Sequence, residues 1–164
     1  IALLDLPLAS SGVLYFVPPR RFARFVTLPA ASAFVIDGDR LEFHDETGAD
    51  SVDLAGNRVA RAIVDHMIGL WSGDLPALRE HYGVDFRAQG ARWTIELRPL
   101  RAPLDQVIER IELEGDGPRL LQMQLVERGG DHTRTTFSKT EVDRELSAPE
   151  LARIFPPAGA TPRP

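Results

Sequence analysis

The residues that could do chemistry in this 164-residue chain are its histidines and the carboxylates beside two of them. Asp65 precedes His66, and Asp131 precedes His132. Such pairs would suit a hydrolytic triad, in which an imidazole takes a proton from a serine. Neighbouring residues on a helix or strand point in different directions, however, and no Gly-x-Ser-x-Gly motif supplies a nucleophile. The sequence therefore does not predict an enzyme.

Metal and cofactor sites are not predicted either. His44, His66, His81 and His132 lie on different predicted elements, without the paired spacing that holds zinc on one helix face. The chain has no cysteine, which excludes thiolate ligands and disulfides. Residues 129–131 (Gly-Gly-Asp) lack the following helix and lysine of a phosphate-binding loop and fit a hairpin turn. We expect no metal and no cofactor.

Composition and charge exclude several further classes. With 43% hydrophobic and 26% charged residues, the chain is typical of a globular fold, and apolar runs such as Val13–Val17 are too short to cross a bilayer. The net charge is −5, and no Lys/Arg stripe of the kind that binds nucleic acid is present. The length predicts a single domain over residues 1–155, followed by a Pro-rich, flexible tail over residues 156–164.

The elements that must position these side chains are mainly strands. Thirteen glycines and thirteen prolines fall mostly between short segments in which apolar and polar residues alternate, which is typical of an antiparallel sheet. The predicted strands are Ser11–Val17, Arg21–Leu28, Ala33–Asp37, Arg40–Asp45, Ala91–Arg98, Gln106–Glu114, Leu120–Glu127 and His132–Ser138.

Three helices are predicted between and after these strands. Residues 57–71 carry apolar side chains at three- and four-residue steps, which indicates an amphipathic helix. A shorter helix is expected from Asp74 through Tyr82, and another over residues 148–154 after the capping Ser147. The order of elements predicts a strongly curved antiparallel sheet with helices laid over one face.

The arrangement of short motifs along the chain resembles a known family. Gly12-Val13-Leu14, Pro19, Phe22, Pro29, Val35-Ile36-Asp37-Gly38 and Leu41-Glu42-Phe43 follow, without a gap, the N-terminal pattern of the LolA-type periplasmic lipoprotein carriers. The same family pattern continues, in the same order, with Trp93 to Pro99, Gly130-Asp131-x-Thr133, Phe137 and Phe155 to Gly159.

The resemblance implies an unclosed β-barrel, or half-barrel, whose concave apolar face is covered by helices and forms a cavity for acyl chains. It implies a monomeric carrier in the periplasm, with a signal peptide removed or outside this chain. The carrier would touch membranes transiently and take lipid-modified proteins, or another acyl lipid, from an inner-membrane exporter to an outer-membrane acceptor. The alternatives are a LolB-like acceptor and insertion module, or a binding or scaffold domain of the same fold that transports nothing.

Alternation along the strands and the family pattern together suggest the cavity lining. The expected lining residues are Leu14, Phe16, Phe22, Val26, Leu41, Phe43, Ile63, Met67, Leu70, Trp71, Trp93, Ile95 and Leu97. The same side chains could instead fill a solid core, and the sequence does not separate the two cases.

Two departures from the family pattern concern arginines. The family has an arginine before the strand-ending proline, which is thought to hold the helical lid, whereas this chain has Pro18. The family has a tryptophan where this chain has Arg24. Arg20, Arg21 or Arg24 could supply the missing charge, as a contact to the lid or to a lipid headgroup. An inward Arg24 would favour cargo with a phosphate or carboxylate head.

Overall fold

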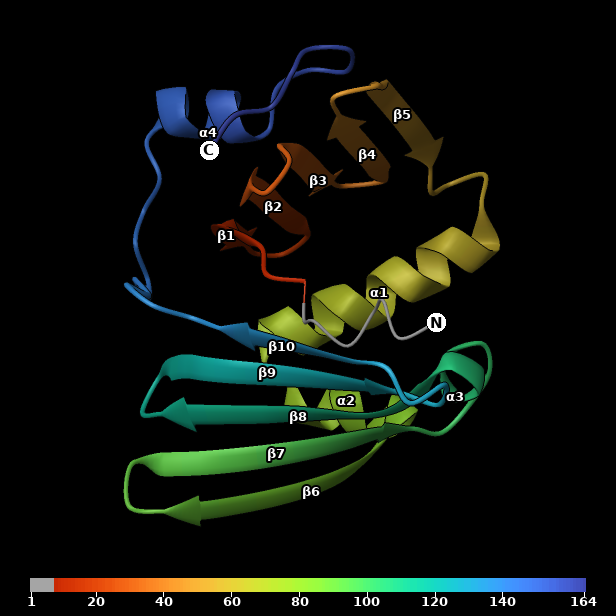
Figure 1. The fold of residues 1–164 in the computed structure, drawn as a ribbon, viewed down its shortest axis with the longest axis vertical. Helices are drawn as coiled ribbons and strands as arrows, with labels where there is room; N and C mark the ends of the chain where they lie inside the picture. The colour runs from red at the N-terminus through yellow and green to blue at the C-terminus, as the bar shows by residue number, and fades with distance from the viewer. Residues whose placement is uncertain (1–7) are drawn as a thin grey trace. The chain divides into compact units, whose positions relative to one another are not determined.

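The computed structural model of the protein describes residues 8–164, which divide into two compact units. Residues 8–72 and 146–164 make up the first unit, and residues 73–145 make up the second. Each unit contains one five-stranded antiparallel sheet (Figure 1). The predicted fold class is confirmed, since the chain is mainly β, its strands pair antiparallel, and helices accompany the sheets.

The first sheet is a meander in which each strand pairs with the next along the chain. Its order is β1 (Ser11–Val17), β2 (Arg21–Leu28), β3 (Ser32–Asp37), β4 (Arg40–Asp45) and β5 (Gly48–Asp53). Gly38 adopts a φ of +64° in the β3–β4 turn, which glycine accommodates without strain. At Gly12, where a β-bulge interrupts the β1–β2 register, a Cβ atom would lie 1.8 Å from the Phe25 carbonyl oxygen. Only glycine fits there.

Two helices pack on opposite faces of this sheet (Figure 1). Helix α1 (Arg58–Ser72) is capped by Asn57, whose Oδ1 accepts a hydrogen bond from the Ala60 amide. Helix α4 (Ala148–Ile154) begins with a capping box between Ser147 and Glu150. We call the two sides of the sheet the α1 face and the α4 face.

The α4 face contains a buried ionic cluster on strand β4. Glu42 is only 4% exposed, and its carboxylate lies 3.2 Å from Arg40 Nε and 3.2 Å from His44 Nε2. Arg40 Nη2 also donates a 2.6 Å hydrogen bond to the Pro156 carbonyl. The cluster therefore satisfies the buried carboxylate and fixes the chain after α4 on the back of β4.

The last residues make further contacts within the first unit. The Arg163 amide donates to the Arg153 carbonyl, and Pro162 is buried. The flexibility of residues 156–164 and the single domain over residues 1–155 both stay predictions.

The second unit carries two short helices on its sheet. Its elements are α2 (Leu75–His81), β6 (Tyr82–Gln89), β7 (Arg92–Pro99), α3 (Leu104–Val107), β8 (Ile108–Asp116), β9 (Arg119–Glu127) and β10 (His132–Thr136). The strand order is β10-β9-β8-β7-β6, so this sheet is also a meander. Its Gly115 packs under Trp93, where a Cβ atom would lie 2.0 Å from the indole ring.

Several predicted elements were wrong in extent or missed. Strands β5 and β6 were not predicted: β5 has one large apolar residue, Val52, and β6 overlaps the end of the helix expected through Tyr82. That helix ends at His81, because Tyr82 is extended. The strand expected over residues 106–114 starts at Ile108, after the single turn of α3. The other predicted strands and helices match within two residues.

Candidate functional site

The α1 face is built from rows of side chains that run across the five strands. Residues paired across an antiparallel sheet project to the same side, so the register defines each row. The covered row, over which α1 packs, consists of Phe16, Phe22, Ile36, Leu41 and Val52. The neighbouring open row consists of Leu14, Arg24, Phe34, Phe43 and Asp50.

Helix α1 shields the covered row with only part of its apolar side. Val64 and Ile68 are buried against Phe22, and Met67 and Trp71 pack at the margin of the same cluster. The Trp71 and Phe22 rings lie 5.5 Å apart between centroids. Of the predicted cavity residues on this helix, Met67 and Trp71 thus meet the sheet.

The other two predicted cavity residues on α1, Leu70 and Ile63, do not pack on this cluster. Leu70 is half-buried, and Ile63 is 45% exposed. Neither belongs to the cluster around Phe22. Helix α1 therefore presents apolar surface to solvent as well as to the sheet.

The open row is apolar but only partly shielded. Phe34 and Phe43 stack edge to face with centroids 5.0 Å apart, and Phe43 is 44% exposed. Leu14 and Phe34 are half-buried at the margin of the covered cluster. Val26 lies one step further along β2 on the same face and is also half-buried. A group of apolar side chains that stay partly exposed marks a surface able to bind an apolar partner.

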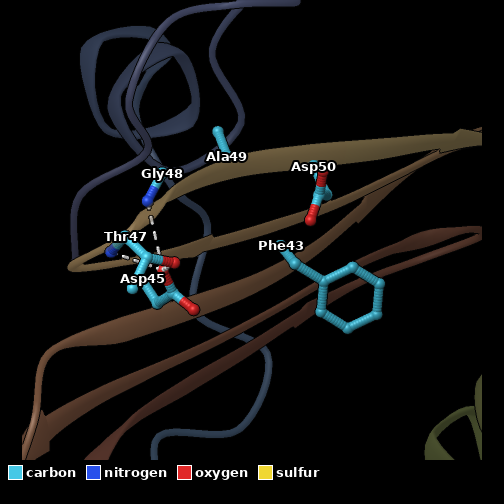
Figure 2. Close-up of a pocket in the computed structure, with 6 residues that line it drawn as sticks. All are labelled: Phe43, Asp45, Thr47, Gly48, Ala49 and Asp50. Carbon is cyan, nitrogen blue, oxygen red and sulfur yellow. Dashed lines mark hydrogen bonds between the residues drawn. The ribbon is translucent and has the colours of Figure 1, made fainter.

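A small pocket adjoins the open row at the β4–β5 hairpin (Figure 2). Its volume is about 170 Å³, and Phe43, Asp45, Thr47 and Asp50 contribute to its lining. Figure 2 shows the Phe43 and Asp50 side chains on the same side of the hairpin. The hydrogen bond from the Thr47 hydroxyl lowers the pKa of Asp45. This pocket is smaller than most ligand sites and, alone, does not accommodate an acyl chain.

The three predicted arginines take three different positions. Arg20 lies in the β1–β2 turn and reaches α1, where its Nη1 is 2.5 Å from Asp65 Oδ1. Arg21 projects to the α4 face, where it pairs with Asp37 at 2.7 Å and lies over the Phe155 ring. Arg20 therefore contacts α1, and Arg21 does not.

Arg24 is the arginine on the open row. Its partners across the sheet are Leu14 and Phe34, and its side chain is exposed. Within residues 8–164, no hydrogen bond or ion pair holds its guanidinium. A cation thus stands among apolar neighbours on the face predicted to bind lipid.

The charged link between the sheet and α1 extends beyond Arg20. Arg61, also on α1, lies 3.1 Å from Asp39 in the β3–β4 turn and 3.9 Å from Asp65. Arg20 Nε donates to the Gly38 carbonyl of the same turn. We call Arg20, Asp39, Arg61 and Asp65 the latch. Sequence analysis missed Asp65 as a partner, although Arg61 and Asp65 have the i, i+4 spacing of a helix-surface ion pair.

The second sheet has an apolar face to which the remaining predicted residues belong. Trp93, Ile95 and Leu97 alternate along β7 on this face, and Leu97 is fully buried. Their cross-strand partners include Phe86 on β6 and Leu113 on β8. The residues on β6 were missed because that strand was missed, although Tyr82, Val84 and Phe86 carry the period-2 signal.

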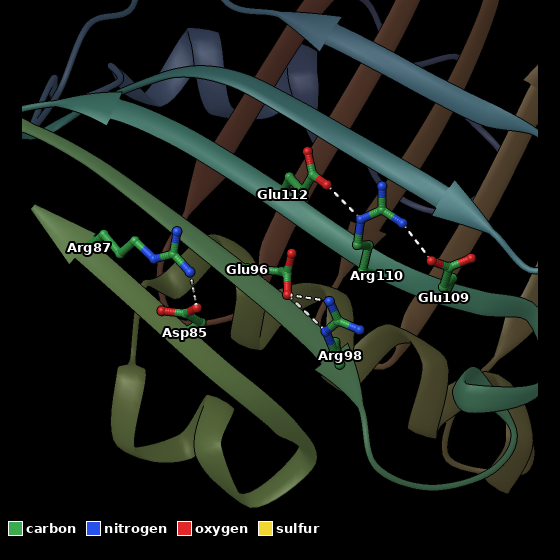
Figure 3. Close-up of polar contacts among 7 residues, drawn as sticks. All are labelled: Asp85, Arg87, Glu96, Arg98, Glu109, Arg110 and Glu112. Atoms are coloured by element: carbon green, nitrogen blue, oxygen red, sulfur yellow. Dashed lines mark hydrogen bonds and ion pairs between the residues drawn. The ribbon is translucent and has the colours of Figure 1, made fainter.

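The opposite face of the second sheet is charged. Arginines on β6, β7 and β8 each pair with a carboxylate two positions away on the same strand, and Arg110 also pairs with its neighbour Glu109 (Figure 3). Hydrogen bonds to Asp85 and Glu112 raise the pKa of Arg87 and of Arg110, respectively. Such exposed pairs keep this face solvated and contribute little to stability.

Within the described residues, no three His, Asp or Glu side chains gather as metal ligands would. Among residues 8–164, none of the helices has the length and apolar character needed to cross a bilayer.

Comparison with known proteins gives a consistent family signal. The family model described as outer membrane lipoprotein carrier protein LolA matches residues 6–150. A protein of Chromohalobacter salexigens named outer-membrane lipoprotein carrier protein is 27% identical over 148 residues, which cover 90% of this chain and 68% of that protein. One of the same name from Nitrosospira multiformis is 28% identical over 152 residues, which cover 92% of this chain and 70% of that protein.

Proposed function

This chain belongs to the outer membrane lipoprotein carrier family LolA, and from that premise we propose that it carries the acyl chains of lipid-modified proteins, or of another envelope lipid, across the periplasm. The observation that carries the proposal is the open row, which exposes apolar side chains beside the covered row on the face where α1 packs. The charged face of the second sheet offers no comparable apolar surface.

The energetic reason for a carrier supports this use of the α1 face. Each methylene group that leaves water contributes about 0.8 kcal/mol. A long acyl chain therefore keeps the lipid or lipoprotein that bears it in a membrane, unless a protein shields the chain from water to a similar extent. The open row and Val26 supply a starting surface. To shield more of an acyl chain, the protein must also expose the covered row, most of which lies under α1.

We therefore assign α1 the role of a movable lid. The helix buries only Val64 and Ile68, and its charged contacts to the sheet run through the latch. Ion pairs at this degree of exposure are weak enough to break and reform during loading and release. In this proposal an inner-membrane exporter loads the monomeric carrier and an outer-membrane acceptor unloads it.

The test uses protein purified from its own cell envelope. Native mass spectrometry and lipid extraction should find acyl lipid on the wild-type protein and less on Phe43→Glu, because a carboxylate in the open row opposes burial of a hydrocarbon chain. Val13→Glu is the matched control, since Val13 is 43% exposed on the α4 face of the same sheet. Equal lipid on both variants would contradict the assigned surface.

Two other results would change the function itself. If the wild-type protein neither carries lipid nor binds a fluorescent fatty acid, carriage is wrong and a scaffold role is favoured. If it binds acyl chains and inserts a lipoprotein into vesicles without any acceptor, the LolB-like insertion role is favoured.

A further inference from the structure

The position of Arg24 on strand β2 carries an inference about the cargo, and this inference depends on the proposed function. Eight residues surround Arg24 on the α1 face: two across the sheet, two along β2 and four on the diagonals. They are Leu14, Phe34, Phe22, Val26, Gly12, Phe16, Ser32 and Ile36. None is acidic.

The carboxylates that could neutralise Arg24 within its own unit are distant or occupied. Asp50 shares the open row but lies three strands away, at about 14 Å for ordinary strand spacing. Asp65 is the sole acid of α1, and it is held by Arg20 and Arg61. Among residues 8–72 and 146–164, no carboxylate thus pairs with the Arg24 guanidinium, which leaves it able to bind an anion from outside the protein.

We propose that Arg24 selects cargo whose acyl chain ends in an anionic headgroup, which is a phosphate or a carboxylate. An acyl chain lying on Phe34, Phe43 and Val26 brings its headgroup beside β2, where the planar guanidinium donates two parallel hydrogen bonds to a pair of anionic oxygens. A neutral headgroup gains no such contact.

A plainer role for Arg24 makes a different prediction. A long arginine stem often lies along apolar surface while its charged end reaches water. In that case Arg24 contributes solubility, and the charge of the lipid headgroup has no influence on affinity.

The experiment compares two lipids with the same chain and glycerol unit. Palmitoyl lysophosphatidylglycerol carries one phosphate charge, and monopalmitoylglycerol carries none. Titrations below their micellar concentrations, at physiological ionic strength, should show the wild-type protein binding the anionic lipid about three- to tenfold more tightly, as expected for a charge-assisted contact at an exposed site. Arg24→Gln should abolish this preference, and Arg24→Lys should retain part of it.

Arg153→Gln is the matched control. Arg153 is an exposed arginine on α4, on the opposite side of the same sheet, so the variant changes the net charge equally but should keep the preference. Circular dichroism verifies that each variant is folded.

The possible outcomes separate this inference from the proposed function. If both lipids bind wild-type protein equally, or if Arg24→Gln keeps the preference, the headgroup assignment is wrong while acyl carriage stands. If neither lipid binds, the proposed function fails as well. If inorganic phosphate alone binds and Arg24→Gln abolishes that binding, the site recognises a free anion, and the lipid assignment is overturned.

Discussion

The latch between α1 and the sheet allows a quantitative prediction about the proposed opening of α1. Removing the Asp65 charge by Asp65→Asn weakens contacts to both Arg20 and Arg61. The Arg20 and Asp65 side chains are 26% and 47% exposed, so solvent screens the pair, and its coupling energy should be about 1 kcal/mol rather than that of a buried pair. A double-mutant cycle with Arg20→Met and Asp65→Asn, followed by urea unfolding, measures this coupling.

The coupling energy of about 1 kcal/mol also limits how much Asp65→Asn can change lipid affinity. If α1 must leave the sheet for an acyl chain to bind, the closed state competes with binding, and each kcal/mol lost from the latch raises affinity by about fivefold. Of the two arginines that contact Asp65, Arg61 lies on α1 itself and Arg20 lies in the β1–β2 turn. Of the two pairs that Asp65 makes, opening of α1 therefore breaks only the Arg20–Asp65 pair, so the gain in affinity should not exceed the coupling energy of that pair. Asp65→Asn should therefore bind a fluorescent fatty acid up to about fivefold more tightly.

The assay is a fluorescence titration at low and high salt. The difference between wild type and Asp65→Asn should shrink in 1 M salt, where the Debye length falls to about 3 Å. Arg58→Gln is the control, since Arg58 lies on α1 and within residues 8–164 has no ion pair. A measured coupling near 1 kcal/mol together with unchanged or weaker fatty-acid binding would refute the gating role of the latch.

Three further predictions concern the scaffold. Glu42→Gln should lower the free energy of unfolding in urea by about 2–3 kcal/mol, because a buried carboxylate loses charged partners; a loss below about 0.5 kcal/mol would contradict this. Gly115→Ala should lower the melting temperature, since its Cβ would clash with Trp93, whereas Gly129→Ala, with open space around it, should not. Burial raises the pKa of Tyr82 to about 12, so the folded state holds this proton where the unfolded state loses it, and stability should fall as pH rises from about 10 to about 12. A spectrophotometric titration of the folded protein in which Tyr82 ionises near pH 12 would agree, whereas ionisation of Tyr82 near pH 10 would contradict this prediction.

The first sheet shows how much of the fold the sequence predicts. Strands β1, β2 and β4 were predicted residue for residue, because prolines or an Asp-Gly turn punctuate strong alternation. Strand β5 has little apolar character and exists because β4 offers it a hairpin partner through the Asp45 turn. Such a strand depends on pairing rather than on its own pattern, so its sequence alone does not predict it.

The candidate site was predicted in part for a similar reason. Alternation places Phe22 and Phe43 on one face of their own strands, but only the register across strands shows that Phe34 completes the open row between Arg24 and Phe43. Phe34 could have been assigned from the Asp37-Gly38 turn, which fixes the β3–β4 register. The latch could not be predicted from the sequence, because its ion pairs depend on the direction in which α1 packs across the sheet.

The two faces of strand β4 have different neighbours, and this should determine which substitutions each position of the strand tolerates. Leu41 and Phe43 project to the α1 face. On the α4 face, Arg40 binds the Pro156 carbonyl, and Glu42 pairs with Arg40 and His44. If the α1 face binds cargo as proposed, substitutions that alter cargo preference should accumulate at odd-numbered positions of β4 and at even-numbered positions of β2. In a saturation library selected for growth, substitutions should be tolerated at alternate positions along each of these strands.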